Sequence, residues 1–371
     1  MAATVYSLAA CGDGASSSAP PVGVTPPPVP PPSSPPPSPT PPPPIAAGRR
    51  ILGISPTDRA DDDFPAVLGN LQQAHIANAT ISLAWDDIET APGVFNPDPN
   101  FTGIANQVYP MAGLSLTVVL VGIDTTADRR PSDLKSRQWD DPVIIARFRA
   151  MQRWVISQLR DVRITAWSIG NEVDALLGND NAAWRAWRRF FESVAPDARA
   201  ALPGVAIGSK ATTNILTNPV ALAAYRELLN DADASMLTYY PSGADYNSAQ
   251  LPPVAQDFDR ALSAYPDKPL RLLECGFCSA SVLGSSETKQ ADFVSAVFQA
   301  WDANIGNMPQ IDYFAAHDFS PAAVQFFINY YGVSGRNFAS WLGSLGLRNW
   351  NGTPKASWQR FVTESSARGF R

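Results

Sequence analysis

Short β-rich runs alternate with longer amphipathic stretches from Ile51 to the end of the chain, and this alternation constrains the fold more than any other feature. We expect strands at 51–55, 79–85, 115–122, 164–169, 205–209, 236–240, 270–274 and 311–316. Helices are expected between most of them, for example at 142–159, 181–194, 219–229 and 288–301, where apolar residues recur every three or four positions. Two of these helices are expected to begin at Asp141-Pro142 and Asn218-Pro219, where a capping residue precedes a proline.

Repeated strand–helix units imply parallel strands that are joined by crossover helices. Eight such units over residues 49–371 predict an α/β fold made of a single (β/α)8 barrel. The alternative is an open, doubly wound sheet, which usually carries a glycine-rich phosphate turn after its first strand. Here the first strand is followed by Pro-Thr-Asp-Arg at 56–59, so the barrel is the favoured interpretation.

The residues before 49 have a different composition. Of the 35 prolines in the chain, 16 lie between Pro20 and Pro44, and all 28 lysines and arginines lie from Arg49 onward. An uncharged segment rich in proline, serine and threonine buries too little surface to fold, and it favours extended polyproline II. We therefore expect a disordered, Pro-rich linker at 19–48 before the barrel.

The first residues of the chain resemble a bacterial lipobox, in which a cysteine is lipidated after cleavage. Leu-Ala-Ala at 8–10 precedes Cys11, but a positively charged n-region and an apolar h-region of normal length are missing. We interpret 1–18 as a truncated signal and lipobox region, and the alternative is an apolar terminus whose cysteine has no role. Lipidation of Cys11 would hold the barrel at the bacterial cell envelope, in the periplasm or on the outer surface; a secreted protein is the other expectation.

The composition argues against several classes of protein. The formal net charge is −6 and no basic stripe is present, which argues against a nucleic-acid partner. The two histidines are too few for a multi-histidine metal site, so we expect no metal. We also expect no cofactor, and we expect the protein to be a monomer. Cys275 and Cys278 make half a zinc site without a second half. Whether they form a local disulfide or stay as two free thiols is left open.

Two glutamates are expected at the carboxyl ends of strands, which is where the active sites of (β/α)8 barrels lie. Glu172 follows the fourth predicted strand and Glu274 ends the seventh, so both are expected to face the same mouth. A carboxylate in such a place is costly unless it is partnered. Paired carboxylates across a barrel mouth suit the cleavage of a glycosidic bond. The alternative is a structural salt bridge from each of them to a barrel arginine.

The sequences around these glutamates resemble those of clan A glycoside hydrolases. Ile-Gly-Asn-Glu at 169–172 is similar to their strand-four signature, and Glu-Cys-Gly at 274–276 is similar to their strand-seven segment. Thr-Tyr-Tyr-Pro at 238–241 resembles the strand-six segment whose tyrosine binds the nucleophile. Within the clan the chain looks like an endo-β-galactanase or β-glucanase, although the strand-seven cysteines depart from the galactanases. The resemblance runs from about residue 51 to 361.

The resemblance implies a retaining enzyme that cleaves β-glycosidic bonds of a poly- or oligosaccharide by double displacement. Glu172 would be the general acid/base and Glu274 the nucleophile. Asn171 would bind the sugar hydroxyl next to the anomeric carbon. Tyr240 is the first choice for the partner of the nucleophile and Tyr239 the second, because one residue of register decides which of them points inward.

The remaining substrate contacts are less defined by the sequence. Many members of the clan carry an aromatic platform at the end of strand eight, where this chain reads Ala-His-Asp-Phe at 316–319. We expect His317 or Asp318 to contact substrate there, and Trp85 to stack on a sugar ring, with a buried structural role as the alternative. Endo action is expected, because an anchored enzyme meets polymers first. The alternative function is a non-catalytic, carbohydrate-binding surface lipoprotein, which would need one carboxylate to be missing or misplaced.

Overall fold

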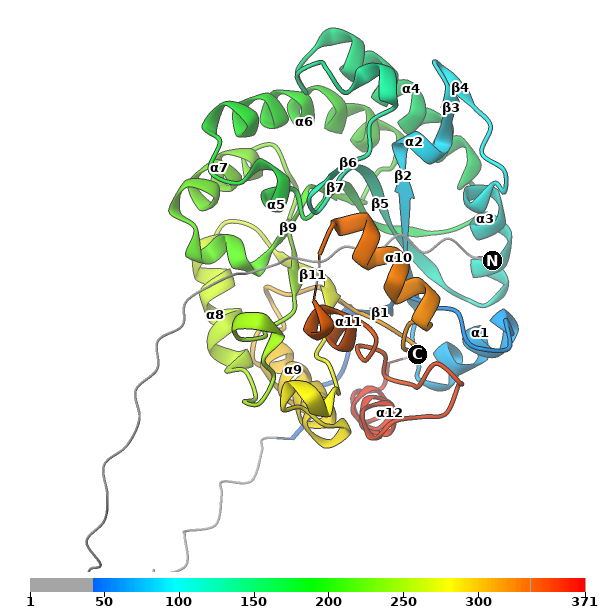
Figure 1. Ribbon diagram of the computed structural model, residues 1–371, viewed down its shortest axis with the longest axis vertical. Coiled ribbons are helices and arrows are strands. Elements are labelled where there is room, and N and C mark those ends of the chain that lie inside the picture. Colours follow the sequence, from blue (N-terminus) through cyan, green and yellow to red (C-terminus); the bar gives the residue numbers. More distant parts are fainter. Residues whose placement is uncertain (1–42, 334, 371) are drawn as a thin grey trace, which may run out of the picture.

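A computed structural model describes residues 43–333 and 335–370 of the chain, which form a barrel of parallel strands surrounded by helices (Figure 1). The barrel strands are β1 (Ile51–Ile54), β2 (Asn78–Ala84), β5 (Ser115–Asp124), β7 (Ile164–Asn171), β8 (Ala206–Gly208), β9 (Lys210–Thr212), β10 (Ser235–Tyr239), β11 (Leu270–Cys275) and β12 (Gln310–Tyr313). All neighbouring pairs among them are parallel, as crossover helices require.

The ring closes within the fifth strand, which is broken into β8 and β9 at Ser209. β8 pairs with β7 and β9 pairs with β10, so the strand order β8-β7-β5-β2-β1-β12-β11-β10-β9 begins and ends in one stretch of chain. Trp187 donates to Ser209 Oγ at 3.3 Å and Tyr225 donates to the Ser209 carbonyl at 2.7 Å, which holds the break in place. The prediction of a (β/α)8 barrel rather than an open sheet is confirmed.

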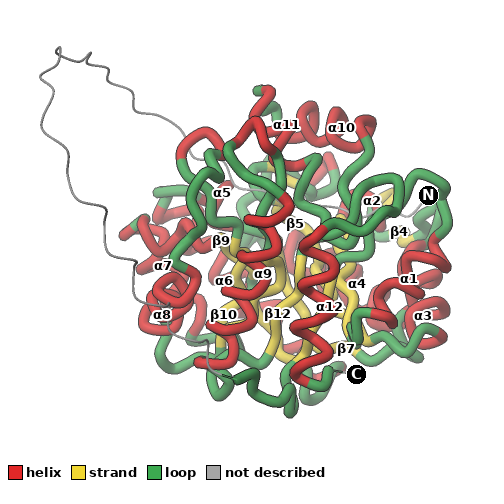
Figure 2. Tube along the Cα trace, turned by 90° about the horizontal axis from the view of Figure 1, so that it is seen from below, coloured by secondary structure: helices red, strands yellow, loops and turns green. Residues whose placement is uncertain are grey.

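An outer layer of helices covers the strands on all sides (Figures 1 and 2). Its members are α1 (Phe64–Gln73), α3 (Phe101–Met111), α4 (Pro142–Gln158), α6 (Asn181–Ala201), α7 (Pro219–Leu229), α8 (Val254–Ala264), α9 (Glu287–Ala303) and α12 (Ala356–Arg368). The predicted helix starts at Asp141 and Asn218 are confirmed, because both side chains accept hydrogen bonds from backbone N–H groups of the first turn.

Further elements lie in the connections that follow the carboxyl ends of the strands. They are α2 (Trp85–Ile88), β3 (Glu89–Ala91), β4 (Val94–Phe95), β6 (Ala127–Asp128), α5 (Val173–Leu177), α10 (Pro321–Tyr331) and α11 (Arg336–Leu342). Figures 1 and 2 show α10 and α11 together across one end of the barrel. We call residues 319–345, which carry these two helices between β12 and α12, the mouth excursion.

A polar cluster inside the barrel surrounds Asp312 on β12. Asp312 is fully buried, and burial raises its pKa to about 6 against the effect of its hydrogen bonds. Its carboxylate accepts hydrogen bonds of 2.7–3.1 Å from Asn78, Thr80, Thr117 and Gln310. Gly53 on β1 leaves room for this carboxylate, since a Cβ at that position would stand 2.0 Å from Asp312 Oδ1. The glycine is therefore required by a close approach within the barrel.

Gly53→Ala is expected to lower the free energy of unfolding by about 1–3 kcal/mol, because the added methyl overpacks the barrel against Asp312. Gly69→Ala is the matched control. Gly69 lies inside α1 with no atom near its Cβ position, so alanine there should stabilise the protein by about 1 kcal/mol through helix propensity. Urea denaturation of the two variants measures both effects, and equal stabilities would contradict the packing argument.

The described chain joins the barrel shortly before the predicted boundary at residue 49. The Ile45 N–H donates to Asp302 Oδ2 at 3.2 Å, and Arg50 pairs with the same carboxylate at 2.7 Å. Ala47 donates to the Arg368 carbonyl at 2.8 Å. Residues 45–48 are therefore attached to the barrel by hydrogen bonds of Ile45 and Ala47. Cys11 and most of the Pro-rich linker lie outside the described residues, and within the described part no helix is long and apolar enough to span a membrane.

Cys275 and Cys278 are free, buried thiols. Cys275 ends β11 and packs in the main core, whereas Cys278 packs beneath the mouth excursion and contacts Ser248 Oγ at 3.2 Å. Burial raises the pKa of both thiols. Of the two alternatives that the sequence left open, the structure has the thiols and not the disulfide, because the two side chains enter different hydrophobic clusters.

Candidate active site

Glu172 follows the last residue of β7 and has a left-handed backbone conformation, with φ at 45°. Such a conformation is uncommon outside glycine and tends to occur at functional sites. Gly170 also has a positive φ, and a Cβ there would stand 2.5 Å from Val173. This tight turn delivers the Glu172 carboxylate to the barrel mouth, where it accepts hydrogen bonds from Thr125 Oγ1 at 3.0 Å and Thr238 Oγ1 at 2.6 Å.

Glu274 lies on β11 with a different set of partners. Its Oε2 accepts a hydrogen bond of 2.6 Å from the Tyr240 hydroxyl, and its Oε1 forms an ion pair with Lys210 Nζ. Both side chains of the ion pair are buried, at 4% exposure for Glu274 and 0% for Lys210. An adjacent ammonium and a phenol donor both favour the ionised form of a carboxyl group.

Thr238 and Tyr240 each lie close to both glutamates. Thr238 on β10 is the register partner of Glu274 on β11, while its hydroxyl donates to Glu172. The pKa of Tyr240 is held well above its usual range by burial first, and then by the charges of Glu274 and Glu172. Both carboxylates therefore act on the same phenol, and the prediction that they face one mouth agrees with this arrangement.

Asn171, next to Glu172, joins a second polar group at the mouth. Its Nδ2 donates to Asp124 Oδ1 at 2.8 Å, and the Tyr330 hydroxyl donates to Asp124 Oδ2 at 2.8 Å. Burial raises the pKa of Asp124 to about 6, although hydrogen bonds from Asn171 and Tyr330 oppose this shift. The Oδ1 atom of Asn171 is buried and has no hydrogen-bond partner among the described residues. An acceptor is thus available for a sugar hydroxyl beside Glu172.

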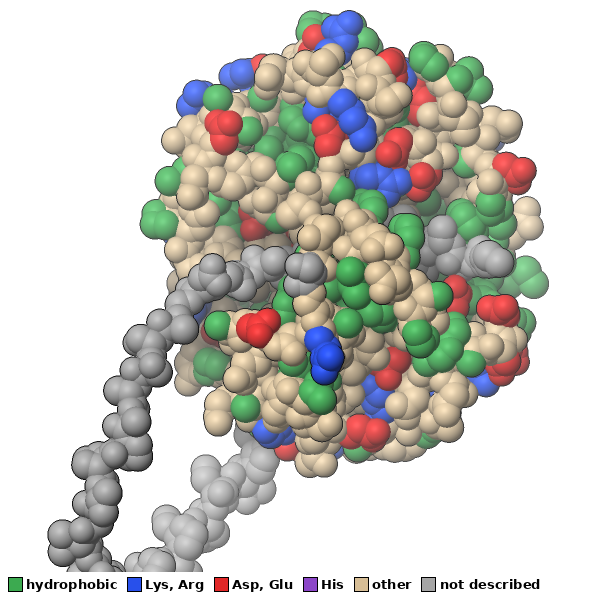
Figure 3. All heavy atoms as spheres, viewed as in Figure 1, with side chains coloured by type: hydrophobic (Ala, Val, Ile, Leu, Met, Phe, Trp, Pro, Cys, Tyr) green, Lys and Arg blue, Asp and Glu red, His purple; other side chains and the backbone are tan. Residues whose placement is uncertain are grey.

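The mouth excursion reaches both sides of the site. Tyr330 at the end of α10 contacts Asp124, and Arg129 donates to the Tyr330 hydroxyl at 3.1 Å. Trp341 on α11 packs edge-on against Tyr240, with ring centroids 5.5 Å apart. A small cavity of about 40 Å³ lies beside Tyr240 and is lined by Thr212, Thr213, Asn214, Thr238, Ser242, Gly243, Tyr246 and Trp341. Figure 3 shows acidic and basic side chains intermixed on this face, with hydrophobic side chains over α10.

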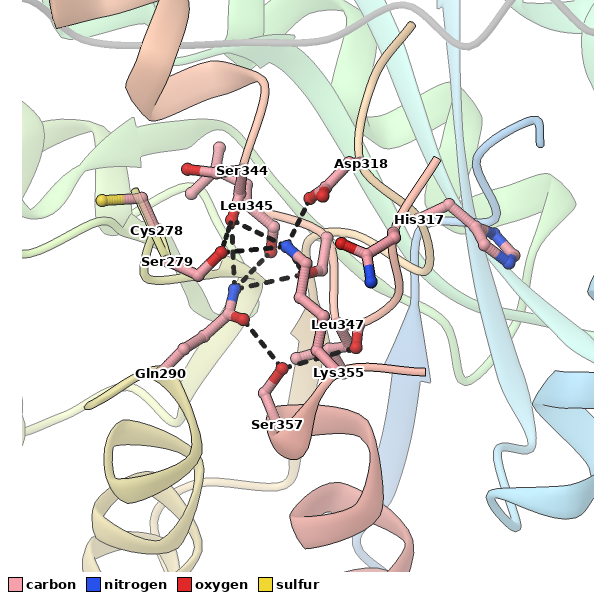
Figure 4. A network of polar contacts seen from close by, with 12 residues as sticks. Cys278, Ser279, Gln290, His317, Asp318, Ser344, Leu345, Leu347, Lys355 and Ser357 are labelled. Atoms are coloured by element: carbon pink, nitrogen blue, oxygen red, sulfur yellow. Dashed lines mark hydrogen bonds and ion pairs between the residues drawn. The ribbon is translucent and has the colours of Figure 1, made fainter. Parts of the chain in front are cut away.

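Lys355 forms hydrogen bonds to residues at both ends of the mouth excursion (Figure 4). Its Nζ donates to Asp318 Oδ1 at 2.7 Å, just before the excursion, and to the Gly346 carbonyl at 2.8 Å, just after it. Gln290 Nε2 donates to the carbonyls of Phe277 at 2.8 Å and Gly346 at 3.2 Å. The same cluster therefore ties the loop after Glu274 to the base of the excursion.

Tyr239 and Trp85, two of the predicted contacts at the site, have structural partners instead. Tyr239 points away from the mouth and donates to Asp257 Oδ2 on α8 at 2.7 Å, because successive strand residues face opposite sides. Trp85 is fully buried; its Nε1 donates to Glu89 Oε2 at 2.6 Å, and its ring packs edge-on against Phe148. It belongs to the core beneath α2 and cannot stack on a sugar.

His317 and Asp318, the other predicted contacts, are also structural. The His317 backbone N–H donates to Thr57 Oγ1 at 2.6 Å, and burial lowers the pKa of the imidazole to about 4, so the ring is neutral at ordinary pH. Figure 4 shows its ring turned away from the Lys355 cluster. Burial raises the pKa of Asp318 to about 6, with Lys355 opposing the shift. Both correct the expectation of a strand-eight substrate contact.

Several site residues carried no sequence signal that selected them. Lys210, Thr125 and Thr238 are polar residues at strand ends like many others, and only the ring geometry brings them to the glutamates. Tyr330 and Trp341 come from the mouth excursion, far from either glutamate in sequence. Within residues 43–333 and 335–370, no group of three or more histidine, cysteine, aspartate and glutamate side chains is arranged to hold a metal ion.

Comparison with solved structures finds glycoside hydrolases of low sequence identity. GH5_18 from Streptomyces cattleya in complex with GlcNAc has a TM-score of 0.66 and 14% identity, covering 88% of this chain and 82% of that one. The exo-β-1,4-mannosidase Op5Man5 from Opitutaceae bacterium strain TAV5 has a TM-score of 0.65 and 17% identity, with coverage of 86% and 59%. A family 39 glycoside hydrolase from Bacteroides cellulosilyticus WH2 has a TM-score of 0.61 and 15% identity, with coverage of 87% and 65%.

Comparison with protein-family models and with curated protein sequences finds no match. At the identities of the structural neighbours, the likeness shows a shared barrel fold.

Proposed function

We propose that this chain is a retaining glycoside hydrolase that cleaves β-glycosidic bonds, with Glu274 as the nucleophile and Glu172 as the general acid/base. The observation that carries the proposal is the pair of carboxylates at the carboxyl ends of β7 and β11, which have different partners. Glu172 accepts hydrogen bonds from Thr125 and Thr238, whereas Glu274 accepts one from Tyr240 and pairs with Lys210. Double displacement needs two such groups in different protonation states. The barrel fold of the structural neighbours supports the same conclusion.

In the first step, a carboxylate oxygen of Glu274 attacks the anomeric carbon as the bond to the leaving oxygen breaks. The Glu172 carboxyl gives its proton to that oxygen and becomes a carboxylate. Glu274 suits the nucleophilic role because Lys210 and Tyr240 both stabilise its charged form. Glu172 suits the acid role because Thr125 and Thr238, two neutral hydroxyls, hold its carboxyl group in place.

In the second step, water attacks the anomeric carbon of the glycosyl ester. Glu172 takes a proton from the water, and the ester electron pair returns to Glu274 as a carboxylate. Two inversions at one carbon give a product of unchanged anomeric configuration. Asn171 Oδ1, a buried acceptor, would receive a hydrogen bond from the hydroxyl next to the anomeric carbon, and this contact would strengthen in the transition state.

The mouth excursion bears on which bonds of a glycan reach the site. Endo action is the expectation from the sequence, but α10 and α11 lie across the mouth and touch Asp124 and Tyr240 through Tyr330 and Trp341. This arrangement favours a substrate that enters by its end, and one structural neighbour is named an exo-β-1,4-mannosidase. We therefore propose β-linked oligosaccharides or chain ends as the substrate class, and the length of the products decides between the two modes.

For the whole chain we propose a monomeric, cofactor-independent enzyme that is anchored to the bacterial cell envelope through a lipid on Cys11. The lipobox-like residues before Cys11 and the prolines that follow it support an anchor and a spacer. The mass of the N-terminal peptide from the native host tests this part. The alternative of a non-catalytic binding protein would require a missing or displaced carboxylate, whereas Glu172 and Glu274 are both present at the mouth.

The direct test is hydrolysis of a panel of 2,4-dinitrophenyl β-glycosides and β-linked oligosaccharides, with the first product followed by proton NMR. We expect cleavage of at least one β-linked sugar, with the β-anomer appearing before mutarotation. First appearance of the α-anomer would contradict the retaining mechanism. No cleavage of any member, by protein that is folded, would contradict the proposed activity.

A further inference from the structure

Lys210 is a fully buried cation in the mouth of the barrel. It is the first residue of β9, where the fifth strand resumes after its break, and it pairs in register with Met236 on β10. Its side chain has no exposed surface, and its Nζ contacts Glu274 Oε1. Removing an ammonium from water is costly, and a buried ion pair is a weak source of stability. Its position against the proposed nucleophile points to a role in the reaction.

The charged and titratable groups around this ion pair come from the carboxyl ends of β5, β7, β10 and β11. Tyr240, after β10, donates to the other oxygen of Glu274. Glu172, after β7, is close enough for its charge to raise the pKa of the same phenol. Asp124 on β5 is close enough for Lys210 to oppose the raised pKa of its carboxyl group. Cys275, next to Glu274, is a neutral thiol because burial raises its pKa.

We propose that Lys210 is a positioning residue that holds Glu274 in its reactive orientation, and that it speeds the second step by stabilising the carboxylate as it leaves the sugar. This inference rests on the proposed function. Lys210 holds Oε1 while Tyr240 holds Oε2, so the plane of the carboxylate is fixed from two sides.

The charge balance of the two steps gives the reason. When Glu274 forms the glycosyl ester, it loses its negative charge, and the proton that Glu172 gives up leaves the new charge on Glu172. The ammonium of Lys210 stays next to Glu274 while the negative charge is on Glu172, because its Nζ is buried beside Glu274. In the second step the C–O bond of the ester breaks with its electron pair going to Glu274, and the proton of water goes to Glu172. The ammonium of Lys210 therefore favours the free carboxylate over the ester.

Removing the cation should slow the second step and let the ester accumulate. An opposite charge within about 4–6 Å favours an ionised carboxyl group by about 1–3 pH units, which corresponds to about 10- to 1,000-fold in the stability of the departing carboxylate. A merely structural lysine would not change the rate of the second step relative to the first.

The test uses the full chain with Lys210→Gln, which keeps a hydrogen-bond donor without the charge, and Lys210→Arg, which keeps the charge. The substrate is the 2,4-dinitrophenyl β-glycoside that the native chain cleaves. The matched control is Arg50→Met, which removes the cation of another buried ion pair, that with Asp302, outside the site. We expect K210Q to release a burst approaching one equivalent of dinitrophenol. The native chain, K210R and R50M should release a smaller burst, because their second step stays fast.

A folded K210Q variant with a burst no larger than that of the native chain would overturn the inference. If K210Q does not fold, as judged by near-ultraviolet circular dichroism, Lys210→Met provides a second neutral variant, and a folded K210M variant with a burst no larger than that of the native chain would equally overturn the inference. A native chain that cleaves no glycoside would instead overturn the proposed function, and this result is separate from the kinetics of the variant.

Discussion

Replacing Glu274 by glutamine should lower kcat/KM by at least about 10⁴-fold while the protein stays folded, because loss of a nucleophile removes the covalent pathway. Glutamine is preferred to alanine for a structural reason. Glu274 is the buried counter-ion of Lys210, and an alanine would leave that ammonium without a partner. The measurement is kcat/KM on the best aryl β-glycoside, together with thermal unfolding of the same samples.

Glu89 supplies the matched control for this prediction. Its carboxylate is buried like that of Glu274, but it is paired with Arg147 and bonded to Trp85 outside the mouth. Glu89→Gln should lower stability and leave turnover per folded molecule near the native value. A Glu274→Gln variant with activity within tenfold of the native chain would remove Glu274 from the mechanism. Equal losses of activity in both variants would point to a general effect of removing a buried carboxylate.

Replacing Glu172 by glutamine should have an effect that depends on the leaving group. General acid catalysis contributes about 10²–10⁴-fold, and a good leaving group such as 2,4-dinitrophenolate needs no proton. We therefore expect a loss of about 10²–10⁴-fold on natural oligosaccharides and a much smaller change in the first step on the dinitrophenyl glycoside. Steady-state kinetics on the natural substrate and a stopped-flow burst on the aryl substrate measure the two effects.

A small anion provides the control for Glu172. Azide needs no general base, so it should restore turnover of the dinitrophenyl glycoside by Glu172→Gln and give the β-glycosyl azide. It should not accelerate the native chain. Equal losses on both leaving groups, or no rescue by azide, would contradict the role of Glu172 as acid/base.

The sequence predicted the barrel and its two glutamates for the same reason. Strand–helix alternation locates the strand ends, and a barrel brings those ends to one mouth, so Glu172 and Glu274 could be placed without knowing any side-chain contact. Alternation along β10 also explains why Tyr240 rather than Tyr239 reaches the nucleophile. The break at Ser209 was not predicted, because neither half of the fifth strand differs in composition from a continuous strand.

The failures arose where long-range packing decides the role of a side chain. Trp85 and Asp318 come after β2 and β12, but Phe148 on α4 packs against Trp85 and Lys355 binds Asp318, so both side chains are buried. Tyr330 and Trp341 approach the site from the mouth excursion, whose course over the barrel depends on the ends that Lys355 fastens. The spacing of residues along the chain contains no signal for these contacts.

The most direct test of the proposed mechanism is to identify the residue that carries the sugar in the covalent intermediate. A 2-deoxy-2-fluoro β-glycoside of the sugar that the native chain cleaves, with a dinitrophenyl leaving group, slows the second step more than the first and traps the ester. Proteolysis and tandem mass spectrometry then locate the label. We predict one fluoroglycosyl group per chain, attached to Glu274. A label on any other residue, or turnover of the natural substrate without a trapped intermediate, would contradict it.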